Sequence, residues 1–159
     1  MNASEPAISF RELFAYTDYL ATRWFAYLAE HEAALEIQVG GETGTLGKLV
    51  EHIVRVEQFF ADRLLGQAPD EKPGTLGVTD LAQMHADASR KFEAYLAMPG
   101  DNNPRRTQML GTRTVSHRKM LAQAALHCVH HWGQVAMEVR QAGLPVGIPQ
   151  DIILTNLME

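Results

Sequence analysis

Four segments of this chain repeat apolar residues every three or four positions, and stretches rich in glycine and proline separate them. This spacing gathers apolar side chains on one face of an α-helix. It predicts helices over residues 9–31, 45–65, 79–97 and 116–142. Each such helix must bury its apolar face against the others, so the pattern predicts an all-α protein built as a four-helix bundle. We expect one domain over residues 1–159, since this length suits a single hydrophobic core.

The ends of the predicted helices carry local signals. Ser9 and Glu12 form the Ser-x-x-Glu pattern of a capping box. Gly143 predicts the end of the last helix. Residues 106–117 hold two β-prone stretches, which predict a small β-hairpin before that helix. The tail over residues 146–159 is apolar enough that we expect it to pack back on the bundle.

Composition narrows the classes of partner. The formal net charge is −5 and the basic residues form no cluster, which argues against nucleic acid as a partner. No uncharged apolar run is long enough for a membrane span, and the first residues lack the pattern of a signal peptide. A single cysteine, Cys128, excludes an internal disulfide and fits a reducing compartment. We therefore expect a soluble cytoplasmic protein.

Two histidines in the last predicted helix, His127 and His131, are four residues apart. On an α-helix this spacing stacks both imidazoles on one face, where they can share a metal ion. His52 lies at the edge of the apolar face of the second predicted helix and offers a third ligand. Three imidazoles leave a coordination position open, as in a catalytic site. Histidines on the buried face of a helix are also common as hydrogen-bonded core residues, so spacing alone leaves both interpretations open.

The order and spacing of these motifs resemble the DinB/YfiT-like family over nearly the whole chain. His127-x-x-x-His131-Trp-Gly-Gln, continuing to Gly143-Leu-Pro145, is similar to the last helix of that family. Residues 45–57 resemble its second helix, and Asp151 fits its closing segment. One position departs from the pattern, because Trp132 stands where the family commonly has arginine.

The resemblance implies a four-helix bundle with one divalent ion held by His52, His127 and His131. Zinc and nickel are the first expectations, and iron, manganese and copper are alternatives. Members of the family are often homodimers. Characterised relatives include transferases that use low-molecular-weight thiols such as bacillithiol or mycothiol, and a thiol-dependent maleylpyruvate isomerase.

The first functional hypothesis is therefore a metal-dependent, thiol S-transferase-like enzyme that acts on small electrophiles, in stress response or detoxification. A divalent ion lowers the pKa of a thiol or a water that it binds, which prepares a nucleophile. A metal-dependent hydrolase or isomerase on the same site is the alternative within enzymes. A bundle that binds a metal or ligand without catalysis is the alternative outside them.

Three further residues near the predicted site carry functional groups. Glu57 and Glu138 are candidates to orient a ligand or to move a proton. Cys128 falls on the apolar face of its helix, which favours a small buried hydrophobe over a nucleophile.

Overall fold

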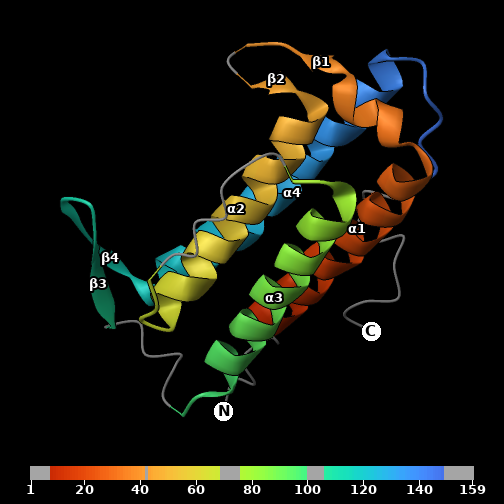
Figure 1. The fold of residues 1–159 in the computed structure, drawn as a ribbon. Helices are drawn as coiled ribbons and strands as arrows, with labels where there is room; N and C mark the ends of the chain where they lie inside the picture. The colour runs from red at the N-terminus through yellow and green to blue at the C-terminus, as the bar shows by residue number, and fades with distance from the viewer. Residues whose placement is uncertain (1–7, 42, 69–75, 100–105, 149–159) are drawn as a thin grey trace.

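The computed structural model describes residues 8–41, 43–68, 76–99 and 106–148. Four α-helices make up most of this part of the chain (Figure 1): α1 (Phe10–Glu30), α2 (Leu46–Leu64), α3 (Val78–Ala97) and α4 (His117–Gln141). Every observed helix end is the predicted residue or the one beside it. The predicted all-α bundle is confirmed. Among the described helices, none is both long enough and apolar enough to span a membrane.

The four helices form a ring in which each helix packs against two neighbours. α1 packs against α3 and α4, and α2 packs against the same two helices. Figure 1 accordingly shows α2 beside α4 on one side of the bundle and α1 beside α3 on the other. The side formed by α2 and α4 and the side formed by α1 and α3 are therefore opposite faces of the molecule.

The helix ends follow the local signals in the sequence. The backbone N–H of Glu12 donates to Ser9 Oγ at 3.2 Å, and that of Ser9 donates to Glu12 Oε2 at 2.6 Å, which completes the predicted capping box. Ser116 caps α4 in the same way, accepting from the backbone N–H of Lys119. Gly143 follows α4 with φ at 76°, a left-handed conformation that glycine adopts without steric cost.

The predicted hairpin before the last helix is also confirmed. β3 (Thr107–Leu110) and β4 (Arg113–Ser116) are antiparallel, and Thr107 pairs with Ser116. Gly111 sits in the turn with φ at 60°. Leu110 packs against the hydrophobic core, so the hairpin lies against the bundle beside the start of α4.

A second hairpin lies between α1 and α2, where the sequence indicates only a glycine-rich turn. The short 3-10 helix η1 (Glu32–Glu36) follows α1, and β1 (Gln38–Val39) pairs with β2 (Gly44–Thr45). Strands of two residues are too short to produce an alternating pattern, so the sequence gives no sign of them. The hairpin leads directly into α2.

The core is aromatic on the side of α1 and α4. Trp24 and Trp132 are fully buried, with their rings stacked at 6.1 Å between centroids. The ring of Phe25 meets Trp132 edge-on at 5.6 Å. Of the tail that was expected to pack back, Val146 and Ile148 lie against this core, and residues 149–159 fall outside the described part of the chain.

Candidate metal centre

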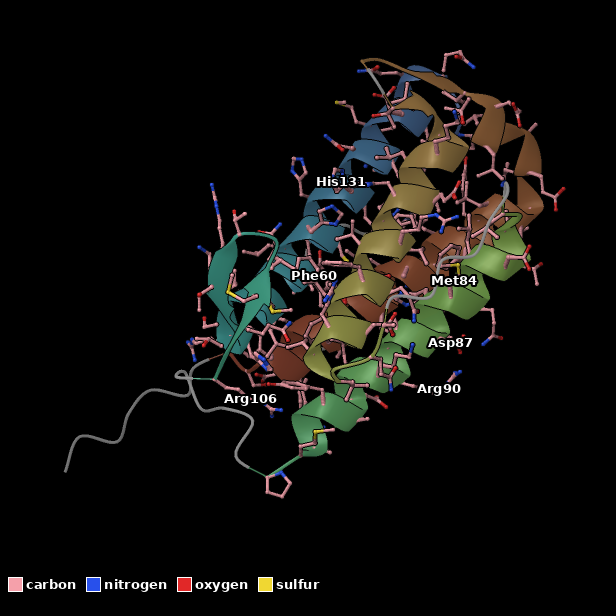
Figure 2. All side chains as sticks on the ribbon, turned by 60° about the vertical axis from the view of Figure 1, so that its left-hand side comes forward. Phe60, Met84, Asp87, Arg90, Arg106 and His131 are labelled. Carbon is pink, nitrogen blue, oxygen red and sulfur yellow. The ribbon has the colours of Figure 1, made fainter. Side chains whose placement is uncertain are left out.

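The last helix carries two of the three predicted ligands on one face. His127 and His131 are both half-buried and lie one turn apart on α4. Figure 2 labels His131 on this helix. The neighbouring residues Cys128 and Trp132 point into the core and are 1% and 0% exposed. Because these neighbours fix the rotation of α4, the two imidazoles are held at the edge of the core, facing α2.

His52 on α2 completes a three-histidine cluster across the interface with α4. Its side chain is exposed, and its Nε2 lies 3.0 Å from Nε2 of His127. The rings of His52 and His131 meet at 5.0 Å between centroids, and those of His127 and His131 at 4.2 Å. One ring nitrogen from each histidine lies within 4.8 Å of the other two.

These separations suit one small divalent ion. Two imidazole nitrogens bound to a tetrahedral zinc at about 2.0–2.1 Å are about 3.3 Å apart. The distance of 3.0 Å between His52 and His127 is close to that value, so side-chain adjustments of tenths of an ångström bring both nitrogens into reach of one ion. The donor set, three imidazoles, fits zinc, nickel, iron or copper.

The surroundings keep the two half-buried histidines in the neutral form that binds metals. Burial, followed by the nearby His131, His52 and His130, lowers the pKa of His127 to about 4. Burial also lowers the pKa of His131. The Nδ1–H of His131 donates to Gln134 Oε1 at 2.6 Å, which fixes the tautomer whose Nε2 carries the free electron pair.

The cluster is open on one side. The group of potential ligand residues found in the described part of the chain has three members, all histidine, and His52 is exposed to solvent. A structural zinc site usually closes four protein ligands around the ion, whereas three ligands leave a position for water or substrate. The arrangement can therefore hold an ion and still bind a small molecule.

The two carboxylates that the sequence suggested for the site, Glu57 and Glu138, lie in different surroundings. Glu57 is 3% exposed, and both of its oxygens are engaged within the core, with His85 and with Cys128. Glu138 is half-buried on α4, seven residues beyond His131, which is about 10 Å along the helix. Their suggested roles in catalysis stay predictions.

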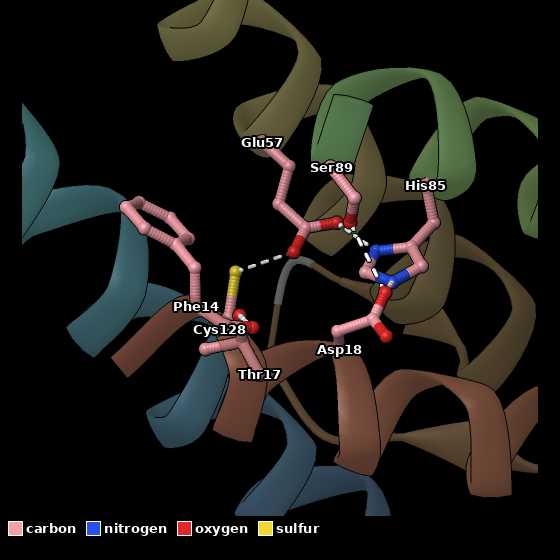
Figure 3. Close-up of polar contacts among 7 residues, drawn as sticks. All are labelled: Phe14, Thr17, Asp18, Glu57, His85, Ser89 and Cys128. Atoms are coloured by element: carbon pink, nitrogen blue, oxygen red, sulfur yellow. Dashed lines mark hydrogen bonds and ion pairs between the residues drawn. The ribbon is translucent and has the colours of Figure 1, made fainter. Parts of the chain in front are cut away.

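A buried polar network, which the sequence analysis missed, connects all four helices (Figure 3). His85 on α3 donates from Nδ1 to Glu57 Oε2 at 2.9 Å and from Nε2 to Asp18 Oδ1 at 3.1 Å. The thiol of Cys128 donates to the other Glu57 oxygen at 3.0 Å, and Ser89 Oγ donates to Asp18 at 3.2 Å. The network thus runs from α4 through the core to the surface of α1.

Burial and neighbouring charges shift the pKa values of the groups in this network. Burial alone lowers the pKa of His85, but the charge and hydrogen bonds of Glu57 and Asp18 outweigh it and raise the pKa to about 10. The hydrogen bond from His85 in turn lowers the pKa of Asp18. Burial, together with the charge of Glu57, raises the pKa of Cys128 well above its usual value. At neutral pH the network therefore holds an imidazolium between carboxylates, beside a protonated thiol.

The remaining histidines near the last helix lie outside the cluster. His130 is exposed, with its ring edge-on to that of His131 at 4.9 Å. His117 is buried, and its Nδ1 lies 2.8 Å from the hydroxyl of Tyr95. Trp132 is a core residue. At the position where the resemblance led us to compare it with arginine, the chain therefore has a side chain that packs in the core.

Comparison with known proteins agrees with the four-helix fold. The model of the DinB family matches residues 2–151. The fold is similar to the crystal structure of a DinB-like protein, YjoA, from Bacillus subtilis, with a TM-score of 0.58 and 23% sequence identity over 88% of this chain and 92% of that one. None of the curated proteins matches the sequence.

Proposed function

The chain belongs to the DinB family, and we propose that it is a metal-dependent enzyme that transfers a low-molecular-weight thiol to a small electrophile. The observation that carries the proposal is the open cluster of His52, His127 and His131. Zinc or nickel is the proposed ion, because neutral imidazole suits both. A divalent ion bound here would lower the pKa of a thiol or a water at the open position.

The chain's own residues supply position and access. Gln134 accepts from Nδ1 of His131 and holds that ring in one tautomer. Burial keeps His127 neutral, so no proton has to leave it at neutral pH before an ion binds. His52, on the solvent side, leaves the approach for a small substrate open. These three features are those of a site that admits a reactant.

Two alternatives share the same cluster. A hydrolase or isomerase would use water or substrate at the open position, and a binding protein would hold the ion or a ligand without turnover. We favour the transferase because residues 45–57 and 127–145 resemble motifs of the DinB family, and some characterised members of that family use thiols. The assay below distinguishes the three.

The first test is metal content by mass spectrometry of the purified chain, after addition of zinc or nickel. We expect a single ion per chain, and none in a variant with His52, His127 and His131 replaced by alanine. His130→Ala is the matched control, because His130 is exposed on the same helix and outside the cluster. The same occupancy in the parent chain and in the triple variant would refute the site.

The second test is turnover. The metal-loaded chain is incubated with a panel of thiols and electrophiles, and thiol consumption is followed with and without a chelator. Metal-dependent thiol loss supports the transferase, and metal-dependent hydrolysis without thiol supports the hydrolase. A chain that binds the ion and turns over neither set is a binding protein.

A further inference from the structure

A cavity of about 690 Å³ lies between α1 and α3, on the face of the bundle opposite the histidine cluster. Its size is within the range of small-molecule sites. Its lining includes apolar, aromatic and charged side chains, among them Phe14, Asp18, Tyr19, Arg23, Ser89 and Glu93. We refer to this cavity as the α1/α3 groove.

The carboxylate of Asp18 in the α1/α3 groove is held by two hydrogen bonds from α3. Its Oδ1 accepts from Ser89 Oγ at 3.2 Å and from Nε2 of His85 at 3.1 Å, while its side chain remains 54% exposed (Figure 3). His85 is 4% exposed and is itself fixed by Glu57. Asp18 is thus held in place from behind by a buried network, and it presents a negative charge to the groove.

Two arginines in the same wall are also held in position. The guanidinium of Arg23 lies over the ring of Tyr19, 4.3 Å from its centroid. Arg11 donates to the backbone carbonyl of Leu96 on α3 at 2.8 Å. Both side chains line the groove and are exposed, so each can meet an anionic group of a ligand.

The charges of the groove favour a ligand that carries both signs. Arg11 and Arg23 oppose Asp18 and Glu93, so the charged side chains in the lining sum to zero. A ligand with a single charge is attracted by one pair and repelled by the other. A zwitterion is attracted to a side chain of opposite charge at each of its two ends.

The spacing along α1 sets the length of such a ligand. Asp18 is five residues from Arg23 and seven from Arg11, which corresponds to about 7.5 and about 10.5 Å along the helix axis. An extended peptide covers about 3.3–3.6 Å per residue, so about two residues span the shorter interval and about three span the longer one. Phe14 and Leu96 offer apolar surface to the side chains of such a ligand.

We propose that the α1/α3 groove binds short zwitterionic peptides of two or three residues, with the ammonium on Asp18 and the carboxylate on Arg23 or Arg11. This site is separate from the three-histidine cluster and does not depend on a bound metal. Its occupant is recognised by its two charged ends and an apolar side chain.

Calorimetric titration of the full chain with leucyl-alanine and leucyl-alanyl-alanine tests the proposal. We expect saturable binding of at least one of them. N-acetylation or C-terminal amidation should weaken it by about tenfold, because each removes one charged partner. Arg23→Gln changes an exposed side chain and leaves the buried network intact. Arg23→Gln should weaken binding of the free dipeptide, whose carboxylate reaches Arg23, and leave binding of the amidated dipeptide unchanged.

The control for the metal site is His131→Ala, which should bind the peptides as the parent chain does, whatever its metal content. No binding of either peptide at millimolar concentration by the folded chain would overturn the proposal. Equal affinity for free and blocked peptides would overturn it as well. So would sedimentation showing that a second copy of the chain covers the groove and that Arg23→Gln releases it.

Discussion

Replacing His85 by leucine tests the buried network most directly. The imidazolium of His85 is 4% exposed and lies between Glu57 and Asp18, at 2.9 and 3.1 Å. The substitution keeps a side chain of similar bulk and removes the positive charge. Glu57, 3% exposed, is then left in the core with the thiol of Cys128 and no cation.

The magnitude follows from burial and charge. Breaking a buried ion pair by removing one partner costs about 3–5 kcal/mol. The rise in the pKa of His85 from 6.5 to about 10 corresponds to about 5 kcal/mol in favour of the protonated ring, which is the same scale. We therefore expect the His85→Leu variant to unfold with a free energy about 3–5 kcal/mol lower than that of the parent chain at neutral pH.

The pH dependence has a defined sign. The pKa of His85 is higher in the folded chain, so the folded state holds the proton more tightly than the unfolded state. The stabilisation is complete below pH 6.5 and is lost as the pH rises to about 10. The difference in stability between the parent chain and His85→Leu should shrink over this range.

Urea denaturation followed by tryptophan fluorescence, at several pH values from 6 to 10, measures both quantities. His130→Leu is the matched control, because His130 is exposed and its loss should change stability by less than about 0.5 kcal/mol. A loss below about 1 kcal/mol in His85→Leu at neutral pH would refute the ion-pair description. A stability difference that does not change with pH would refute the raised pKa.

Three further predictions concern residues of α4. Trp132→Ala should lower the free energy of unfolding by about 3–5 kcal/mol in the same urea assay, because the ring is fully buried against Trp24. Gln134→Leu removes the acceptor for Nδ1 of His131 and should weaken metal affinity by about 10- to 100-fold, measured by competition with a chelator. The thiol of Cys128 is buried and its pKa is raised, so it should resist iodoacetamide at pH 8 in the folded chain and react in urea.

The sequence predicts the helices well because their signals are local and long. Each helix carries about five to seven turns of apolar periodicity, and Ser9 and Gly143 mark ends that the structure reproduces. The hairpin of β1 and β2 was not predicted, since its strands have two residues each. Periodicity also says nothing about the pairing of helices, which depends on how the loops cross the bundle.

The three histidines could be singled out because two of them share one face of one helix. His52 meets them across the interface between α2 and α4. This contact depends on the tertiary packing of the helices, which periodicity allows but does not predict. The network of His85, Glu57 and Cys128 was not predicted, although the sequence holds a signal for it. His85 follows Met84 on the apolar face of α3, and Glu57 lies on the same face of α2 as Ile53. A charged residue on an apolar face calls for a buried partner, and each of these two supplies it for the other.

From the positions of the two clusters, we expect the network to help hold the three histidines of the proposed metal site in place. Glu57 follows His52 by five residues on α2, and Cys128 directly follows His127 on α4. The hydrogen bond of 3.0 Å between Cys128 and Glu57 therefore joins the two helices that carry the three histidines, and both of its residues lie within about one and a half turns of a histidine of the cluster. A metal site requires its ligands to be held to within about half an ångström, and packing of apolar side chains alone tolerates small sliding of helices. A directional bond between buried side chains, anchored in turn by His85 on α3, opposes such sliding.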